Sequence, residues 1–496
     1  MLNFRQIENS VLKYLRDTFN ESYIVCRAAS QSVVSLLHDE VLFYRKNLIE
    51  NQGGFSSFNR LQSLQNRKIQ LTLYGEFTLK HAHVLRQISL SLLVLTALVF
   101  FAFTPRLFYS KVNKIYLFYA ATQEQVYRNG STNPLETFLR SDHLNLIKGE
   151  ETILVELRKK RIFQKSQSRN LVVTRSASLY LYRHALTFPE KFILLFQSVA
   201  RFFSILVKKD RLRTLGVILP EILIDIPVSL LCVKRSLISG QIRTESNNLI
   251  QPVFFFSRNP ETLNYVIWTS SNSIPVRPNN LYHDLFDDSI FFQQDIDHNF
   301  VWTDSHKLFL RNYTSAQIWV KGPMLLYPGT LDGRETDASY FEVQVFDVTP
   351  YSSPLYLSSM YSSESMKNFL SSILDVCQEF AISSSESTLV TLKPKRSFYD
   401  AHDDNYLRFI TQRVDSGDLR LLDPSLDLYG LISKADFVIC IPFTSPAIIA
   451  KSLGVPVCYF FSNVDFSLDS HVDGIPVVDS AAELLSLLKL SISGRN

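Results

Sequence analysis

The stretch DFVICIPFTSPAIIAKSLGVPVCYFF, residues 436–461, contains two short apolar runs on either side of a segment with helical spacing. The runs DFVICI and VPVCYFF lack the polar alternation of a half-exposed strand, which is typical of strands buried on both faces of a parallel sheet. Between them, SPAIIAKSLG has a proline in its first turn and ends on glycine, as helices often do. The stretch therefore predicts a strand–helix–strand unit of a parallel α/β fold.

The same alternation extends in both directions from this unit. In the C-terminal third we expect strands at 344–347, 388–392 and 419–422, and helices at 365–379, 403–414, 428–434 and 481–490. Upstream, a first α/β unit is expected to close near residue 323, with strands at 114–122, 152–157, 170–174, 252–257 and 264–270.

Composition narrows the classes of function. The 496 residues are enough for two domains with cores of their own. The net charge is only +4 and no basic stripe with stacking aromatic residues is present, which excludes a nucleic-acid binder on charge grounds. The five cysteines form no CxxC pair and have no zinc-ligand spacing, so we expect reduced thiols and no metal site.

One apolar run has the length of a membrane segment. Residues 87–105 contain no charged side chain, and a helix of this length spans ~28 Å, close to the ~30 Å bilayer core. We expect a helix that crosses the membrane or lies half-inserted in it; the alternative is a buried helix of a soluble core. Basic residues are more frequent after the run, so a spanning helix would favour a cytoplasmic position for the following domain. The run 191–209 is a core helix or a second interfacial helix.

The sequence TLKPKR places three cations at the end of a predicted strand, namely Lys393, Lys395 and Arg396. Because ligands of parallel α/β sheets bind at the carboxyl ends of strands, these cations are suited to a phosphate or diphosphate. The alternative is a solvated basic turn.

The sequence IPFTSP follows the next buried strand with Pro442, Phe443, Thr444 and Ser445. We expect Ser445 to cap the following helix, whose free N–H groups would attract an anion. A helix cap without a ligand is the alternative.

Further candidates follow other strands. Asp347 and Thr349 leave the first strand of the C-terminal unit, in FDVTP. Asp304 and His306 lie near the start of a predicted helix after residue 301, where either could face a cleft, although a lone histidine more often belongs to a core. Gly322 is expected in the linker between the two α/β units.

The motifs IWVKGP, FDVTP, LKPKR and ADFVICIPFTSPAIIAKSLGVPVCYF occur in this order, preceded by TSSNSIP, which contains Asn272. Together they resemble the bacterial polysaccharide-biosynthesis proteins named for their PFTS motif, over about residues 251–484. The resemblance implies a GT-B-like architecture, in which two Rossmann-like domains face a cleft. It implies an acceptor domain at 107–323 and a nucleotide-sugar donor domain at 324–496. The resemblance does not extend to the preceding residues, where apolar spacing alone predicts a helical segment at 1–85 and a hydrophobic, membrane-associated helix at 86–106.

The same resemblance implies a metal-independent glycosyltransferase without a cofactor. It would transfer a sugar from a nucleotide-sugar to a saccharide or lipid-linked acceptor in O-antigen or capsule-type biosynthesis. With the hydrophobic helix, we expect the protein at the cytoplasmic face of the inner membrane, either peripheral or single-pass. The cations and the PFTS residues would bind the donor phosphates, Asp304 or His306 would deprotonate the acceptor, and Asp347, Thr349, Asn272 and Gly322 would line the cleft. Alternatives are a nucleotide-sugar epimerase, a polyol-phosphate transferase, or a non-catalytic scaffold of a polysaccharide assembly complex.

Overall fold

The computed structural model describes most residues of 81–103, 114–121, 134–157, 171–207, 218–244, 252–270, 277–278, 295–324, 340–350, 361–461, 466–467 and 473–493. The expected helical segment over 1–85 lies almost wholly outside this part of the chain. Asn272, Arg396 and Phe443 also lie outside it.

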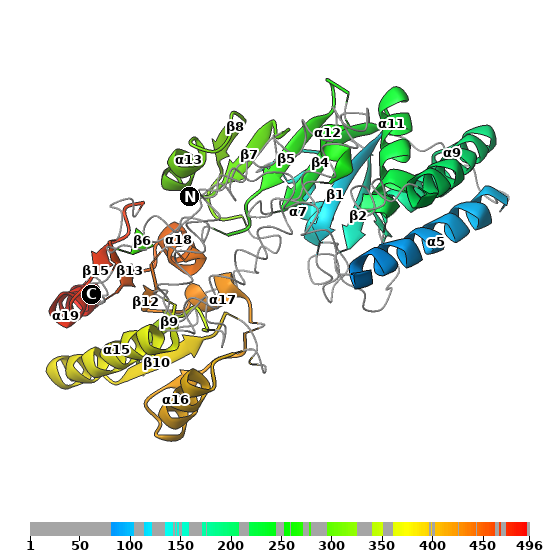
Figure 1. Ribbon diagram of the computed structural model, residues 1–496. Coiled ribbons are helices and arrows are strands. Elements are labelled where there is room, and N and C mark those ends of the chain that lie inside the picture. The colour runs from blue at the N-terminus through cyan, green and yellow to red at the C-terminus, as the bar shows by residue number, and fades with distance from the viewer. Residues whose placement is uncertain are drawn as a thin grey trace, which may run out of the picture.

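The first sheet has seven strands in the order β3-β2-β1-β4-β5-β7-β8, and every neighbouring pair is parallel (Figure 1). The strand order reverses direction between β1 and β4, and in such sheets the ligand crevice lies at the carboxyl ends of the strands at this point. The strands are β1 (Ile115–Ala121), β2 (Thr152–Leu157), β3 (Leu171–Thr174), β4 (Ile238–Thr244), β5 (Leu263–Ile267), β7 (His298–Val301) and β8 (Gln317–Val320).

The second sheet repeats this topology with six parallel strands in the order β11-β10-β9-β12-β13-β15. Its order reverses between β9 and β12. The two Rossmann-like sheets confirm the parallel α/β fold that the apolar runs predicted. The strands are β9 (Phe341–Phe346), β10 (Thr388–Lys393), β11 (Arg420–Leu421), β12 (Phe437–Cys440), β13 (Val457–Phe460) and β15 (Val477–Val478).

Helices cover both faces of each sheet, and one hydrophobic core is shared between the domains. On the first sheet, one face packs against α5 (His81–Phe103), α8 (Ala177–His184), α9 (Phe188–Val207), η2 (Glu221–Asp225), α11 (Ile226–Lys234) and α12 (Val253–Phe256). On the second, one face packs against α15 (Ser363–Ser384), α16 (Asp404–Asp415) and α19 (Ala481–Ser493). The shared core joins the remaining two faces through α7 (Pro134–Arg140), α17 (Leu428–Ile432) and α18 (Ser445–Ser452).

Two elements differ from the sequence prediction. The run 252–257 is a short helix, α12, instead of a strand, because its aromatic side chains pack onto the sheet while the carbonyl of Phe254 accepts the buried Gln241 amide at 2.7 Å. Strand β4 was not predicted, since its sequence ISGQIRT is polar and contains glycine. Gly240 is needed there because a Cβ atom would lie 2.5 Å from a ring carbon of Tyr116.

The apolar run forms helix α5, which packs against α9 and α8 with Ser91, Leu98 and Ala102 buried. Within the described part of the chain, none of the helices has both the length and the apolar character needed to cross a membrane.

Candidate functional site

The loops that follow β9, β10 and β12 carry the C-terminal candidates. Because these strands are neighbours in the order β10-β9-β12, their carboxyl ends lie side by side at one edge of the sheet. The reversal of strand order between β9 and β12 falls at the same place, where α/β folds bind ligands. The structure thus brings Asp347, Lys395 and Ser445, which lie far apart in sequence, to one edge.

Asp347 holds the first two of these loops together. Its carboxylate accepts hydrogen bonds from Tyr406 Oη at 2.6 Å, from Thr349 Oγ1 at 3.5 Å and from the backbone N–H of Lys395. Burial raises the pKa of Asp347 to about 6, although the hydrogen bonds favour its carboxylate form. Asp347 and Thr349 are almost fully buried. They therefore fix the loops from beneath instead of presenting oxygens to a ligand.

The cations of LKPKR separate into two kinds. Lys393 is buried, and its Nζ donates to the carbonyl oxygen of Pro424 at 2.7 Å. Burial lowers the pKa of Lys393, and the carboxylates of Asp423 and Asp347 partly offset this shift. Lys395 is exposed. Lys393 is thus held within the domain, and of the two described cations Lys395 is the one that reaches the surface.

The PFTS turn differs from its prediction in one residue. The N-cap of α18 is Thr444, with extended backbone angles (φ −99°, ψ 144°), and Ser445 is the first helical residue. The Thr444 hydroxyl donates to the carbonyl of Ile441 at 2.8 Å and forms no cap bond to the helix. The expectation that Ser445 caps the helix was wrong: Ser445 already belongs to the helix, so the cap position falls one residue earlier, at Thr444. Pro442, Thr444 and Ser445 are all buried.

The PFTS turn is also where the two domains meet. Ser445 Oγ lies 3.3 Å from Oγ of Ser270, which follows strand β5 of the first sheet. Nearby, Ser305 donates to Asp473 Oδ1 through its backbone N–H (3.2 Å) and its hydroxyl (2.6 Å). Because Ser270 and Ser305 follow the ends of β5 and β7, and Ser445 follows β12, the carboxyl edges of the two sheets face each other.

A short antiparallel pair adds to this junction. Strand β6 (Arg277–Pro278) comes from the first domain and β14 (Phe466–Ser467) from the second. The Tyr429 hydroxyl of α17 donates to the carbonyl of Pro323 at 3.4 Å. Gly322, with a φ of +79°, lies between the two sheets, where a left-handed backbone favours glycine.

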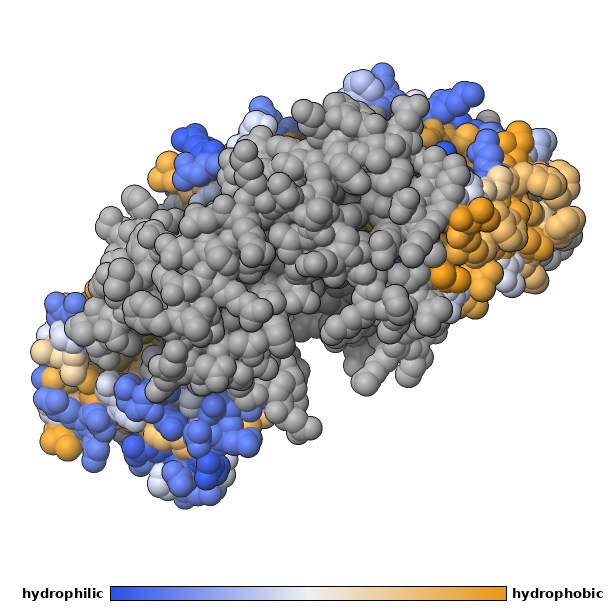
Figure 2. Space-filling model, viewed as in Figure 1, coloured by the Kyte–Doolittle hydropathy of each residue, from blue (hydrophilic) through white to orange (hydrophobic). Residues whose placement is uncertain are grey.

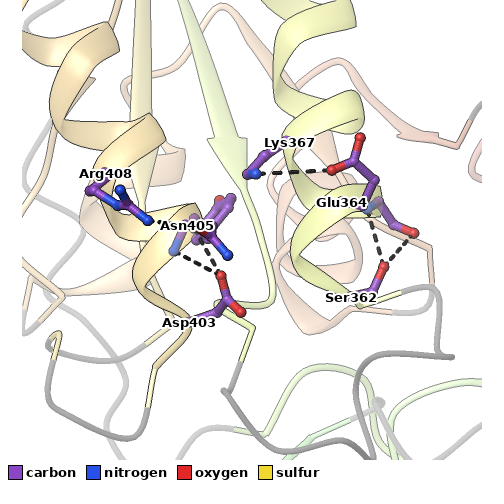
Figure 3. Close-up of polar contacts among 8 residues, drawn as sticks. Ser362, Glu364, Lys367, Asp403, Asn405 and Arg408 are labelled. Atoms are coloured by element: carbon purple, nitrogen blue, oxygen red, sulfur yellow. Dashed lines mark hydrogen bonds and ion pairs between the residues drawn. The ribbon is translucent and has the colours of Figure 1, made fainter. Parts of the chain in front are cut away.

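Two longer helices also begin at the carboxyl edge of the second sheet, side by side (Figure 3). The Ser362 hydroxyl accepts from the N–H of Ser365 at 3.2 Å at the start of α15. Asp403 accepts from the N–H groups of Asn405 (2.9 Å) and Tyr406 (3.1 Å) at the start of α16. Side chains of the protein thus cap both helices, whereas α18 has no side-chain cap bond. The positive ends of three helix dipoles point toward this edge.

The predicted acid–base residues of the first domain lie in different environments. Asp304 is exposed in the first turn of α13 (Asp304–Leu310), beside the Ser305–Asp473 contact. His306 is fully buried, with its ring 4.6 Å from that of Trp268, and burial lowers its pKa to about 3. The structure therefore places Asp304 at the junction and His306 in the core.

A group of carboxylates that was not predicted from the sequence lies at the carboxyl ends of β1 and β2. Glu156 and Glu221 lie close enough to Asp225 for their charges to raise its pKa, and Glu156 and Asp225 lie near the buried Tyr119 hydroxyl. The pKa of Asp225 is raised to about 8, mainly by burial and to a smaller extent by repulsion from the Glu221 carboxylate. Glu221 and Asp225 belong to the π-helical turn η2, a feature that recurs at functional sites. The sequence feature that could have indicated these buried carboxylates is the presence of two acids in the apolar run ILPEILIDIP.

Residues 218–488 match the family described as "polysaccharide biosynthesis PFTS motif protein", which is more than half of the chain. The chain belongs to this family. The match extends from the carboxylate-bearing turn η2 to helix α19, and so includes both partners of the Ser270–Ser445 contact. No curated protein sequence matches the chain.

Solved structures with partial similarity share little sequence with this PFTS-motif protein. TarM is 11% identical with a TM-score of 0.33, and the alignment covers 54% of this chain and 52% of TarM, so the chain spans about half of its length. UDP-GlcNAc 2-epimerase from Methanocaldococcus jannaschii is 9% identical with a TM-score of 0.38, covering 76% and 92%. Trehalose-6-phosphate synthase OtsA is 12% identical with a TM-score of 0.39, covering 77% and 91%.

The bond network of Asp347 predicts unequal effects of two substitutions. Asp347→Ala should lower the free energy of unfolding of the C-terminal domain by about 2–4 kcal/mol, because it leaves the buried hydroxyls of Tyr406 and Thr349 without this acceptor. Tyr406→Phe removes only one hydrogen bond and should lower it by about 1 kcal/mol. Denaturant unfolding followed by circular dichroism measures both changes. Equal effects of the two substitutions would contradict the linking role of Asp347.

The raised pKa of Asp225 predicts an unusual dependence of stability on pH. The folded state retains a proton that the unfolded chain releases above about pH 4, so stability should fall as the pH rises from 5 toward 8. Asp225→Asn should make this fall shallower and raise the melting temperature more at pH 8 than at pH 5. The exposed Asp404→Asn serves as the matched control. If the melting temperatures of wild type and Asp225→Asn differed by the same amount at every pH, the raised pKa of Asp225 would be excluded.

Proposed function

We propose that this PFTS-motif protein is a glycosyltransferase that moves a sugar from a nucleotide-sugar to a saccharide or lipid-linked acceptor during synthesis of a bacterial surface polysaccharide. The observation that carries the proposal is the contact between Ser445 and Ser270 at 3.3 Å. It sets the carboxyl edges of two Rossmann-like sheets against each other, so a donor on one edge can react with an acceptor on the other. Membership of a polysaccharide-biosynthesis family supports this choice of chemistry.

The donor would bind on the edge of the second sheet. Departure of the nucleotide leaves negative charge on a phosphate, and fixed positive groups lower the energy of that transition state. Lys395 and its neighbour Arg396 supply such charge, together with the N-terminal end of α18. In this proposal these groups act without a resident metal or cofactor. The buried Thr444 and Ser445 contribute by holding the turn in place.

The acceptor would bind on the edge of the first sheet, where a carboxylate removes the proton of the attacking hydroxyl. We assign this role to Asp304, because it is exposed and adjoins the Ser305–Asp473 contact between the domains. His306 is not assigned to it, since its imidazole is buried against Trp268.

Loss of the two cations tests the proposal. Lys395→Ala combined with Arg396→Ala should weaken nucleotide-sugar binding at least tenfold, by roughly 1.4 kcal/mol or more, because charge-assisted bonds to the phosphates disappear. The measurement is a thermal-shift titration of the full chain with UDP-, GDP-, CMP- and TDP-linked sugars. A ligand at a hundred times its dissociation constant stabilises a fold by about 2.7 kcal/mol, which such a titration detects.

The matched control is Lys434→Ala, an exposed lysine that precedes strand β12 and so lies near the opposite edge of the sheet. This variant should bind the donor as wild type does. Unliganded melting temperatures of the double variant and of Lys434→Ala should stay close to that of wild type, since the exposed charges of Lys395 and Lys434 contribute little to stability. A wild-type protein that responds to no nucleotide-sugar, or a double variant that responds as wild type does, would overturn the proposal.

A further inference from the structure

Helices α5 and α9 form an antiparallel pair at the end of the molecule farthest from the second sheet (Figure 1). The rings of Phe103, at the end of α5, and Phe192, near the start of α9, are 5.1 Å apart. The Tyr182 hydroxyl of α8 lies within hydrogen-bonding distance of the carbonyls of Leu98 (3.2 Å) and Lys191 (3.0 Å). One buried tyrosine thus joins both helices to the domain.

The outward side of α5 is apolar. Leu92, Leu93, Phe100 and Phe103 are 50%, 67%, 63% and 65% exposed. The hydroxyl of Thr96, on the same side, donates to the carbonyl of Leu92 at 2.9 Å, so its hydrogen-bonding needs are met within the helix. None of these outward side chains of α5 therefore needs a hydrogen bond from water.

Helix α9 carries large apolar side chains on its outward side as well as on its buried side, which includes Leu194, Leu195 and Phe202. Its buried side includes Lys191 and Ser198, which donate to backbone carbonyls at 2.8 and 2.6 Å. Its outward side carries Phe196, Phe203 and Val207, which are 70%, 59% and 81% exposed. A helix surrounded by water normally turns its polar side outward. Together, the outward sides of the two helices make a largely hydrophobic surface at one end of the molecule, the α5–α9 face (Figure 2).

Among the residues that the structure describes, the exposed charges on and beside the α5–α9 face are positive. Helix α5 contains no acidic residue, and the one acid of α9, Glu190, forms an ion pair with Arg235 at 2.6 Å. The exposed cations nearby are Arg201 on α9, Arg183 at the end of α8 and Lys234 at the end of α11. The face is apolar, has cations on and beside it, and has no unpaired carboxylate on its two helices. Such a surface complements an anionic lipid surface.

We propose that the α5–α9 face docks this protein onto a bilayer that contains anionic lipids, with both helices lying along the membrane plane. Their exposed phenylalanine and leucine side chains insert at the boundary between headgroups and acyl chains, while the cations meet lipid phosphates. The buried side of α5, with Leu98 and Ala102, stays packed against the domain. This proposal is independent of the assignment of a glycosyl donor.

Vesicle flotation of the full chain tests the docking. Wild type should float with vesicles of phosphatidylcholine mixed with phosphatidylglycerol, and more weakly with phosphatidylcholine alone. Phe100→Ser, Phe196→Ser and Phe203→Ser combined should weaken the partition onto mixed vesicles by about a thousandfold or more, because each of the three phenylalanines contributes roughly tenfold or more. The control combines Ile382→Ser and Leu490→Ser, which remove apolar side chains of similar exposure (77% and 68%) from the second domain. It should float as wild type does.

Melting temperatures and sedimentation velocity of the same proteins complete the test. The phenylalanine variant should melt close to wild type, since it replaces exposed side chains. Failure of wild type to float with either vesicle would overturn the proposal, and so would flotation that the phenylalanine substitutions leave unchanged. A wild-type dimer that does not float, and that those substitutions convert to a monomer, would assign the face to a second copy of the chain instead. Equal flotation on neutral and anionic vesicles would remove the role of the cations.

Discussion

The arrangement of this molecule depends on one contact, between the PFTS turn and the end of strand β5. Ser445 and Ser270 meet there, and helix α18 continues from the contact into the core that both domains share. The Ser305–Asp473 hydrogen bonds and the β6–β14 pair strengthen the same junction. The shared core holds the two Rossmann-like domains together as well. At the junction, the carboxyl edges of the two sheets face each other and can serve a single reaction.

The junction shows that the described residues of the PFTS motif have a structural role. Pro442, Thr444 and Ser445 are buried, and the Thr444 hydroxyl is bonded to its own turn. Similarly, Asp347 and Lys393 bind protein groups and hold the neighbouring loops. Much of the recognisable sequence signature therefore builds the edge of the sheet. The groups available to a ligand are the exposed ones carried on that edge, such as Lys395.

The sequence predicted the C-terminal domain well, because each strand buried on both faces is an unbroken apolar run. DFVICI and VPVCYFF correspond to β12 and β13. The strands that precede Asp347, Lys395 and Ser445 proved to be neighbours in the sheet. Tertiary contacts explain what was missed. Strand β4 is polar because Gln241 bonds to α12 and Gly240 makes room for Tyr116. The cap at Thr444 and the burial of His306 depend on packing that local patterns do not encode.

The first domain combines two features that the sequence hinted at separately. Its carboxyl edge holds Asp304 at the junction and the carboxylates around Asp225 under η2. Helices α5 and α9, which pack against η2 and lie at the end of the molecule away from the second sheet, carry the apolar α5–α9 face. The apolar run at 88–103 suggested a membrane, but the structure packs one side of that helix into the domain and leaves the other outward. A hydrophobic segment of nearly spanning length can thus be one half of a two-helix surface.

The central claim, that the two carboxyl edges face each other at the PFTS turn, can be tested by cross-linking. With Ser270→Cys and Ser445→Cys in one chain, the two thiols should occupy nearly the positions of the hydroxyls, 3.3 Å apart, and should form a disulfide on mild oxidation. Mass spectrometry of the digested, unreduced protein measures the linked peptides. The account predicts an intrachain link between positions 270 and 445 in most molecules. Two free thiols at these positions, or links formed only between chains, would contradict it.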